Sequence, residues 1–213
     1  NNWIFNKDSI FFDFGTAGVS EMTFDNDNII HVSNADTSGG LLQINLPVTF
    51  EDTTVDYTVS DFGGNASTLD IDPSDASNHV MKVIKTQGSE IWAGTTIGTA
   101  SGFASTIPFT TAATKMSVKV WSPAAGLPIL LKVENTDSAT HTCETLTNTT
   151  IANAWHTLVF DFSQEAPETT PLSTGLTNNW VFNKASIFFN FGTAGDSEMT
   201  FYFDNLITNF INR

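Results

Sequence analysis

The acidic side chains are the first candidates for catalysis in this sequence. Hydrolysis of a glycosidic bond, for example, needs two carboxyl groups held opposite each other at a set separation. The clustered acids lie instead beside prolines: Asp70, Asp72 and Asp75 around Pro73, and Glu165 and Glu168 around Pro167. Proline among short polar residues is typical of turns, so these groups indicate loops and not a catalytic pair.

Nucleophilic, metal-dependent and cofactor-dependent chemistry lack their usual signatures as well. The four histidines are scattered, and none has a Cys or His neighbour at metal-binding spacing: His31, His79, His141 and His156. No Gly-x-Ser-x-Gly elbow, phosphate-binding loop or dinucleotide fingerprint occurs. The single Cys143 excludes an intrachain disulfide. We therefore predict that the chain is not an enzyme.

The charge of the chain restricts its partners. Eight basic residues stand against 23 acidic ones, the net charge is −15, and the only arginine is Arg213. A nucleic-acid binder needs a basic stripe to displace counterions, so nucleic acid is excluded as a partner and a neutral ligand is favoured. No run of 18 apolar residues occurs, so the sequence predicts no insertion into a membrane.

Short strands must position the remaining candidates. Apolar and polar residues alternate with a period of two in five segments: 116–121, 129–134, 155–162, 186–191 and 200–207. In the first segment the even positions are apolar and form one face, whereas Lys119 and Trp121 lie on the other. Clusters of Gly, Pro, Asn and Asp separate the segments. The pattern predicts an all-β fold, a jelly-roll β-sandwich.

An internal repeat divides the chain. Residues 1–30 reappear as residues 178–207 without a gap, and 23 of the 30 positions are identical. Because the second copy ends the chain, we expect the first copy to end a preceding unit, with a repeat of about 160 residues plus a linker. The sequence thus predicts the C-terminal strands of a sister repeat at 1–30, a linker at 31–45 and a complete module at 46–211.

One difference between the copies bears on assembly. Tyr202 and Phe203 of the second copy correspond to Asp25 and Asn26, which are poor strand formers. Strands separated from their own unit offer unpaired edges. We therefore expect residues 1–30 to dock on the module or on a neighbouring molecule, or to exchange strands with it.

The order of motifs resembles a known family over roughly residues 46–210. The motifs are Leu46–Glu51, Phe62–Gly64, Val80–Val83, Glu90–Gly94, Val118–Pro123, Leu130–Asn135, Asn153–Leu158, Phe160–Phe162 and Phe201–Asn205. This order is similar to that of the β-sandwich carbohydrate-binding modules appended to bacterial laminarinases and found in surface glycan-binding proteins. They form the broad group of carbohydrate-binding families four, nine, sixteen and twenty-two. The resemblance implies a glycan groove, a polysaccharide partner, and a secreted or cell-surface bacterial protein.

The resemblance also implies a structural Ca²⁺ ion near the first and last strands. Carried over to this chain, the ligands are the carboxylates of Glu51 and Asp204. Ca²⁺ prefers several oxygens from carboxylates and carbonyls, which suits this pair. The alternative is that both are ordinary solvated residues at strand ends, since no EF-hand spacing is present.

Sugar recognition needs an aromatic platform with polar groups beside it. Trp92 is the best candidate platform, because its small neighbours leave the ring open, and Trp121 is the second. Lys119 shares the face of Trp121, and Lys132 and Glu134 occupy the corresponding face of the next strand. Lys85 adds a further cation. The alternative for the lysines is that their stems cover apolar surface while their charged heads stay in water.

These observations predict non-catalytic binding of an extracellular polysaccharide, most simply a neutral β-glucan of the laminarin type. Such binding would target an enzyme or a cell surface to the glycan, and tandem copies would raise avidity. Two alternatives remain open. The module could be a structural spacer in a secreted or adhesin-like protein, or the lysines could bind an acidic glycan such as alginate.

Overall fold

The computed structural model describes residues 5–6, 9–13, 19–23 and 40–208. The chain forms two compact units, Asn1–Gly40 and Leu41–Arg213. In the first unit, β1 (Phe5–Asn6), β2 (Ser9–Asp13) and β3 (Val19–Thr23) form an antiparallel sheet in that order. The rest of the first copy and residues 31–39 of the predicted linker lie outside the described residues.

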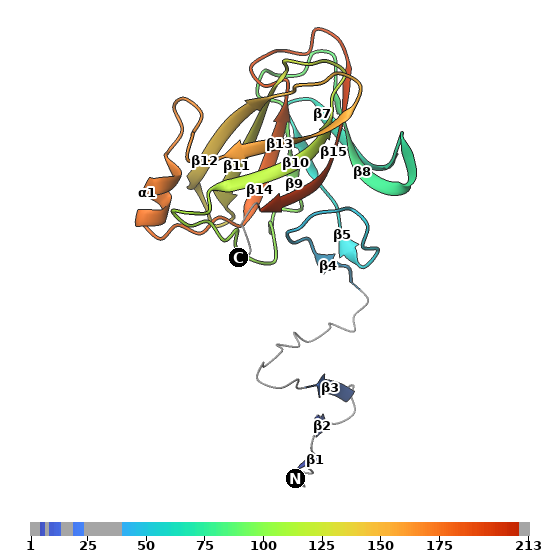
Figure 1. Ribbon diagram of the computed structural model, residues 1–213, viewed down its shortest axis with the longest axis vertical. Helices are drawn as coiled ribbons and strands as arrows, with labels where there is room; N and C mark the ends of the chain where they lie inside the picture. Colours follow the sequence, from blue (N-terminus) through green and yellow to red (C-terminus); the bar gives the residue numbers. More distant parts are fainter. Residues whose placement is uncertain (1–4, 7–8, 14–18, 24–39, 209–213) are drawn as a thin grey trace. The chain divides into compact units, whose positions relative to one another are not determined.

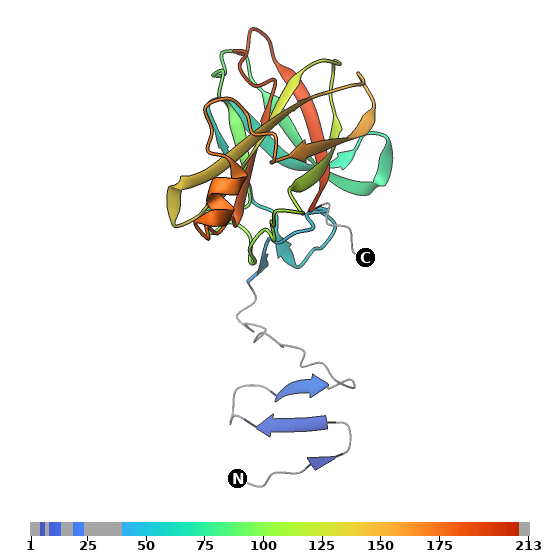
Figure 2. The same ribbon diagram turned by 60° about the vertical axis from the view of Figure 1, so that its left-hand side comes forward.

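The second unit is a sandwich of two five-stranded antiparallel sheets, which face each other in Figures 1 and 2. One, here called the β10 sheet, has the order β13-β10-β15-β8-β7: Trp155–Asp161, Lys115–Trp121, Met199–Thr208, Asp75–Lys85 and Asn65–Asp72. The other, the β11 sheet, has the order β12-β11-β14-β9-β6: Ser138–Asn148, Pro128–Asn135, Lys184–Phe189, Gly94–Ile97 and Ser60–Phe62. The short strands β4 (Leu42–Gln43) and β5 (Val55–Asp56) pair in parallel. The prediction of an all-β jelly-roll sandwich is confirmed.

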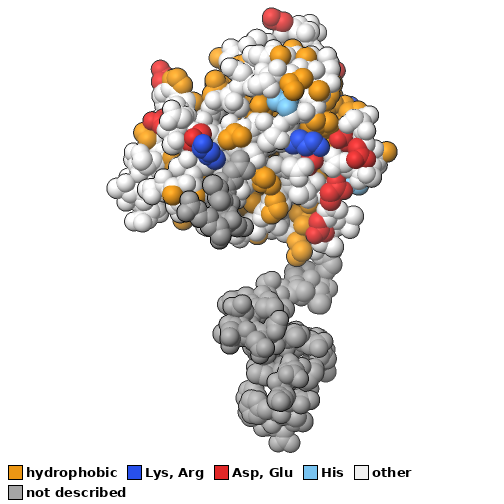
Figure 3. Space-filling model, in the orientation of Figure 1, with side chains coloured by type: hydrophobic (Ala, Val, Ile, Leu, Met, Phe, Trp, Pro, Cys, Tyr) orange, Lys and Arg blue, Asp and Glu red, His pale blue; other side chains and the backbone are white. Residues whose placement is uncertain are grey.

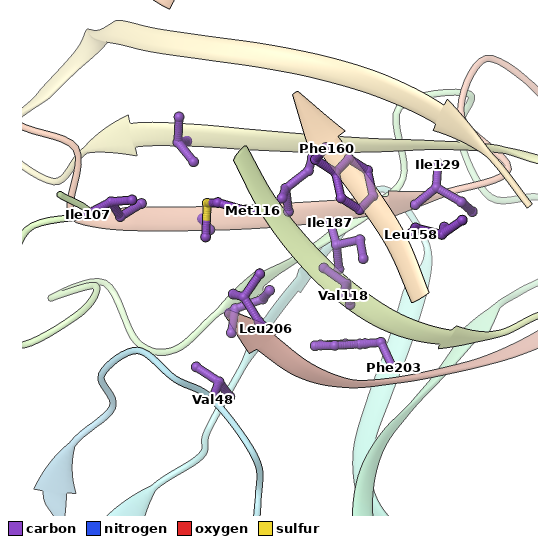
Figure 4. Packing of buried hydrophobic residues seen from close by; sticks show 14 of the residues in the cluster. Val48, Ile107, Met116, Val118, Ile129, Leu158, Phe160, Ile187, Phe203 and Leu206 are labelled. Atoms are coloured by element: carbon purple, nitrogen blue, oxygen red, sulfur yellow. The ribbon is translucent and has the colours of Figure 1, made fainter. Parts of the chain in front are cut away.

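Alternation along the strands builds the core between the sheets. In β10 the fully buried residues are Met116, Val118 and Val120, and in β11 they include Ile129 and Leu131. Figure 4 shows such side chains from both sheets directed toward one another, together with Phe160, Ile187 and Phe203. The core also includes Ile44, so packed structure begins before Leu46.

The strands of the repeated segment lie at the centre of the sandwich. β14 lies between β11 and β9, and β15 lies between β10 and β8, so each is the middle strand of its sheet. The first segment of the unit joins the last strand through an antiparallel bridge between Val48 and Leu206. The same sequence behaves differently in the first copy, where β2 and β3 pair with each other.

Helical structure is minor in the described part of the chain. One helix, α1 (Leu172–Thr177), follows β13, and sequence periodicity did not predict it, because six residues are too few to establish a helical repeat. Among the described residues, no helix has the length and apolar character that a membrane crossing requires.

Candidate functional site

A groove of about 400 Å³ lies on the outer face of the β11 sheet. This volume is within the range of small-ligand sites. The floor and walls come from all five strands of the sheet and two loops, and the lining residues are Phe62, Trp92, Thr96, Leu130, Lys132, Glu134, Glu144, Ser186, Phe188 and Phe191. Several residues on this outward face are almost as buried as the core, including Leu130 and Phe188. Because these outward side chains are so little exposed to solvent, the face of the sheet is hollowed and not flat.

An apolar row crosses the floor of the groove. Leu130 pairs with Leu146 of β12 on one side and with Phe188 of β14 on the other. Phe188 in turn meets the ring of Phe62 edge-on at a centroid distance of 5.4 Å, and Phe191 edge-on at 5.8 Å. This row ends in an aromatic wall.

Trp92 completes the wall. Its side chain is 50% exposed. The indole stacks on Phe62, with centroids 6.2 Å apart and 14° between the ring planes. Gly94 makes room for the assembly, because a Cβ there would lie 2.6 Å from the ring of Phe62 and 2.7 Å from that of Phe188.

A polar row lies beside the apolar one. Lys132 pairs in register with Glu144 of β12 and with Ser186 of β14, and the Ser186 hydroxyl lies 2.9 Å from that of Thr96. In the adjoining row, Glu134 of β11 faces Lys184 of β14. The groove therefore offers an apolar strip and a strip of donors and acceptors side by side.

Two lysines hold the carboxylate of Glu134. Lys132 Nζ and Lys184 Nζ each lie 2.8 Å from one of its oxygens, and the Glu134 side chain is only 10% exposed. Burial raises the pKa of Glu134, but the hydrogen bonds from the two lysines outweigh it, so the net pKa is lowered. Burial instead raises the pKa of Glu144, and the charge of Lys132 offsets this only in part. Lys132, Glu134 and Glu144 line the groove and Lys184 binds Glu134 from beside it, so two cations and two carboxyl groups balance at this site.

The structure brings together three of the predicted site residues. Trp92, Lys132 and Glu134 all line the groove. Trp121 and Lys119 do not join them, because β10 and β11 belong to different sheets. The expectation that Lys119 and Lys132 occupy corresponding faces of neighbouring strands is therefore wrong. In a sandwich, strands that follow each other in sequence need not be neighbours in a sheet.

Trp121 and Lys119 lie on the outer face of the β10 sheet. Trp121 is half-buried and meets Tyr202 edge-on, at a centroid distance of 5.6 Å. Lys119 Nζ lies 4.8 Å above the ring of Trp155, whose Nε1 donates to Asp72 Oδ1 at 3.0 Å. These aromatic side chains contact one another, as expected for packing. Acidic side chains gather along the edge of this face near the β7–β8 hairpin (Figure 3).

Lys85 requires a second correction. Its side chain is 0% exposed, and Nζ donates to the backbone oxygens of Phe189 (3.2 Å) and Asn190 (3.0 Å). A ligand in solvent cannot reach it. Lys85 is in phase with Met81 and Val83, which are both buried, so the alternation of β8 already directs it inward.

The proposed calcium ligands lie near the β7–β8 hairpin. Asp204 is 0% exposed, and its Oδ2 accepts from Asn78 Nδ2 at 3.4 Å and Asn205 Nδ2 at 2.8 Å. Glu51 accepts from the backbone nitrogen of His79 at 2.6 Å and lies 3.0 Å from its Nδ1. Within the described residues, no group of three His, Cys, Asp or Glu side chains is arranged to hold a metal ion.

Of the ten lining residues, the sequence predicts only Trp92, Lys132 and Glu134 as site residues. Alternation places Leu130, Phe188 and Phe191 on strands, and Phe62 enters only through the Phe62–Gly64 motif, so none of the four is predicted to line a site. The available signal was that β11 and β14 carry large apolar residues on both faces. An outward face with Leu130 and Phe188 must be covered by something or hollowed.

The fold is similar to solved structures at low sequence identity. An exo-β-agarase matches with a TM-score of 0.50 and 10% identity, over 75% of this chain and 24% of that one. An arabinose-bound α-L-arabinofuranosidase matches with a TM-score of 0.49 and 16% identity, over 79% and 26%. The family 11 carbohydrate-binding module of a cellulosomal cellulase of Clostridium thermocellum matches with a TM-score of 0.46 and 17% identity, over 79% and 96%.

The likeness to the agarase shows the fold alone. The chain spans about a quarter of the length of the agarase and of the arabinofuranosidase. No protein-family model matches the sequence, and no curated protein matches it.

Proposed function

We propose that this chain is a non-catalytic module that binds an extracellular polysaccharide in the groove of the β11 sheet. The observation that carries the proposal is the apolar row ending at Trp92 and Phe62, which runs beside the polar row of Lys132, Ser186 and Thr96. A sugar ring has an apolar face and a rim of hydroxyl groups. Stacking on the first row and hydrogen bonding to the second would satisfy both.

The balanced charge of the groove favours a neutral ligand. Both lysine ammonium groups bind Glu134, so neither is free to pair with a uronate. Lys82, Lys85 and Lys119 belong to the other sheet and add nothing to the groove. We therefore propose a neutral β-glucan of the laminarin type as the ligand, in preference to an acidic glycan such as alginate.

The same ion pairs argue against hydrolysis. A glycosidase needs one free carboxylate and one carboxylic acid on opposite sides of the bond. Glu144 has a raised pKa, but both oxygens of its neighbour Glu134 are held by lysines. The module would then tether a secreted or cell-surface protein to the glycan without cleaving it.

Affinity electrophoresis against laminarin, alginate, xylan and chitin tests the function. Retardation by laminarin that Trp92→Ala weakens supports the proposal, and release of new reducing ends by the pure protein contradicts the absence of catalysis. If no polysaccharide retards the protein, the spacer function replaces this one.

We also propose that a structural Ca²⁺ ion binds between Glu51 and Asp204. Asp204 is fully buried, and among the described residues it forms no ion pair. Burial and the charge of Glu51 raise its pKa, although hydrogen bonds from Asn205 and Asn78 and the charge of Lys119 act against this. A hard cation with further backbone or amide oxygens would compensate this buried acid.

We further propose that residues 1–30 dock by edge pairing and do not replace residues 178–207. Ala185 and Phe203 are fully buried, and the first copy has Asp8 and Asn26 at those positions. Burying these polar groups without partners would cost several kcal/mol, roughly 2–7 for each group. Light scattering at high concentration tests docking between molecules. A variant without residues 1–40 should be monomeric, and an intact protein that is also monomeric would contradict such docking.

A further inference from the structure

Lys85 joins the two sheets at one end of the sandwich. It is the last residue of β8 in the β10 sheet, and its ammonium group donates to the carbonyls of Phe189 and Asn190, where β14 of the β11 sheet ends. Burial lowers the pKa of Lys85. No carboxylate among the described residues pairs with it. Burying an ammonium group without a counter-ion is unfavourable. Its hydrogen bonds to these two carbonyls compensate for part of that cost, and they tie the end of β8 to the end of β14.

Two loops begin at this junction. The first, residues 86–93, follows β8 and carries Trp92 to the groove; the second, residues 190–198, follows β14 and carries Phe191. Lys85 lies at the root of the first loop, and its acceptor Asn190 lies at the root of the second. Asn190 has a φ of 48°, in the left-handed region. The backbone therefore turns sharply at the residue whose carbonyl oxygen Lys85 binds.

Backbone hydrogen bonds fasten the loops to each other. Gly88 N donates to Gly195 O at 2.7 Å, Gly195 N donates to Ser89 O at 2.9 Å, and Gly192 N donates to Ile91 O at 2.9 Å. The last of these lies directly beside Trp92. A Cβ at Gly195 would collide with Thr86 O and Ser89 Oγ, so the loops are packed as closely as backbone permits.

We propose that Lys85 is a positioning residue for the groove. It fixes the roots of the two fastened loops, so that Trp92 and Phe191 stand in place before a ligand arrives. Rigid anchors lower the ordering cost of binding, so this arrangement raises affinity without contact between Lys85 and the ligand. The effect on affinity rests on the proposed function, whereas the effect on the loops does not.

Lys85→Met tests the proposal, because it keeps an unbranched, buried side chain and removes the donor. In NMR spectra without ligand, we expect the Nε1–H resonance of Trp92 to shift, and the Gly192 and Gly195 amides to exchange faster with solvent. The indole resonances of Trp121 and Trp155 should not move. Unchanged Trp92, Gly192 and Gly195 signals would overturn the proposal, whether or not any glycan binds.

Calorimetric titration with laminarin tests the effect on affinity. We expect Lys85→Met to bind about tenfold more weakly, which corresponds to about 1.4 kcal/mol. Val118→Ala, a truncation in the core of the β10 sheet, is the control for lost stability and should keep the affinity. In a Trp92→Ala background, Lys85→Met should cause a smaller further loss, because only its effect through Phe191 remains.

The outcomes separate the two proposals. If the unaltered protein binds no polysaccharide, the proposed function fails and the NMR measurement still decides the role of Lys85. If Lys85→Met binds laminarin as tightly as the unaltered protein, the positioning role fails and the function stands. Should Lys85→Met not fold, hydrogen exchange of the unaltered protein decides: Gly88, Gly192 and Gly195 amides that exchange as fast as those of an open loop overturn the proposal.

Discussion

The indole of Trp92 lies nearly parallel to the phenyl ring of Phe62, although Phe62 ends strand β6 and Trp92 lies in the loop before β9. Gly63, directly after Phe62, allows this approach, because a Cβ there would lie 3.0 Å from the indole and 2.8 Å from the backbone of Ala93. The stacked pair leaves one face of the indole for a ligand.

Removal of the Trp92 indole should weaken the binding of a glycan without lowering the stability of the fold. We expect Trp92→Ala to lower the affinity for laminarin by about tenfold or more, since a stacking surface is lost, and to leave the melting temperature nearly unchanged because the side chain is half-exposed. Calorimetric titration and thermal unfolding measure the two effects. Trp121→Ala, on the opposite sheet, is the matched control, and loss of binding in that variant would contradict the location of the site.

Neutralisation of Glu134 should change which glycan is bound. Glu134→Gln removes the carboxylate that binds Lys132 in the groove and Lys184 beside it, so the charge of the site changes from balanced to positive. We expect weaker retardation by laminarin and new retardation by alginate in affinity electrophoresis. Glu168→Gln, which neutralises an exposed acid outside the groove, makes the same change in net charge and is the control. Strong retardation of the unaltered protein by alginate would contradict a neutral ligand.

Calcium should raise the stability of the module. Ligand at 100 times its Kd adds about 2.7 kcal/mol, and the melting temperature should therefore rise by about 5 °C or more when Ca²⁺ replaces chelator. Mg²⁺ at the same concentration should raise the melting temperature less, because it loses its bound water molecules reluctantly. Asp204→Asn should lose the response. Identical melting in Ca²⁺ and in chelator would contradict the site.

Asp161 should make stability depend on pH in the acid range. Burial raises its pKa, but hydrogen bonds from Ser163, Thr114 and Lys115 lower it more, to about 2 from 3.8. A lowered pKa in the folded state adds stability that is complete above pH 3.8 and is lost as the pH falls toward 2. The contribution is about 2 kcal/mol.

Urea unfolding at several pH values measures this contribution. Asp161→Asn should be less stable than the unaltered protein at neutral pH, and the two should converge near pH 2. Asp137→Asn, in an exposed turn, serves as the control. A constant difference between Asp161→Asn and the unaltered protein across this range would disprove the assignment.

Local patterns were sufficient for the strands but not for the site. Alternation identified the core face of β10 and β11, because side chains change sides at every residue in any strand. It could not assign the two strands to different sheets, since that depends on contacts far apart in sequence. Trp92 was recognised because glycine and alanine beside it are a local signal. Phe62, Phe188 and Phe191 were not, because Phe62 lies on β6 and the other two on or just after β14, and these strands are far apart in the sequence.

The central position of β14 and β15 has a consequence for how the chain is made. A ribosome releases residues 184–208 after every other strand of the sandwich, and until then β11, β9, β10 and β8 each lack a neighbour. Neither sheet can close early, so the nascent module carries open hydrogen-bonding edges through most of its synthesis. Completion of the fold and of the groove therefore coincide, because Lys184, Ser186 and Phe188 arrive on the strand that closes the β11 sheet.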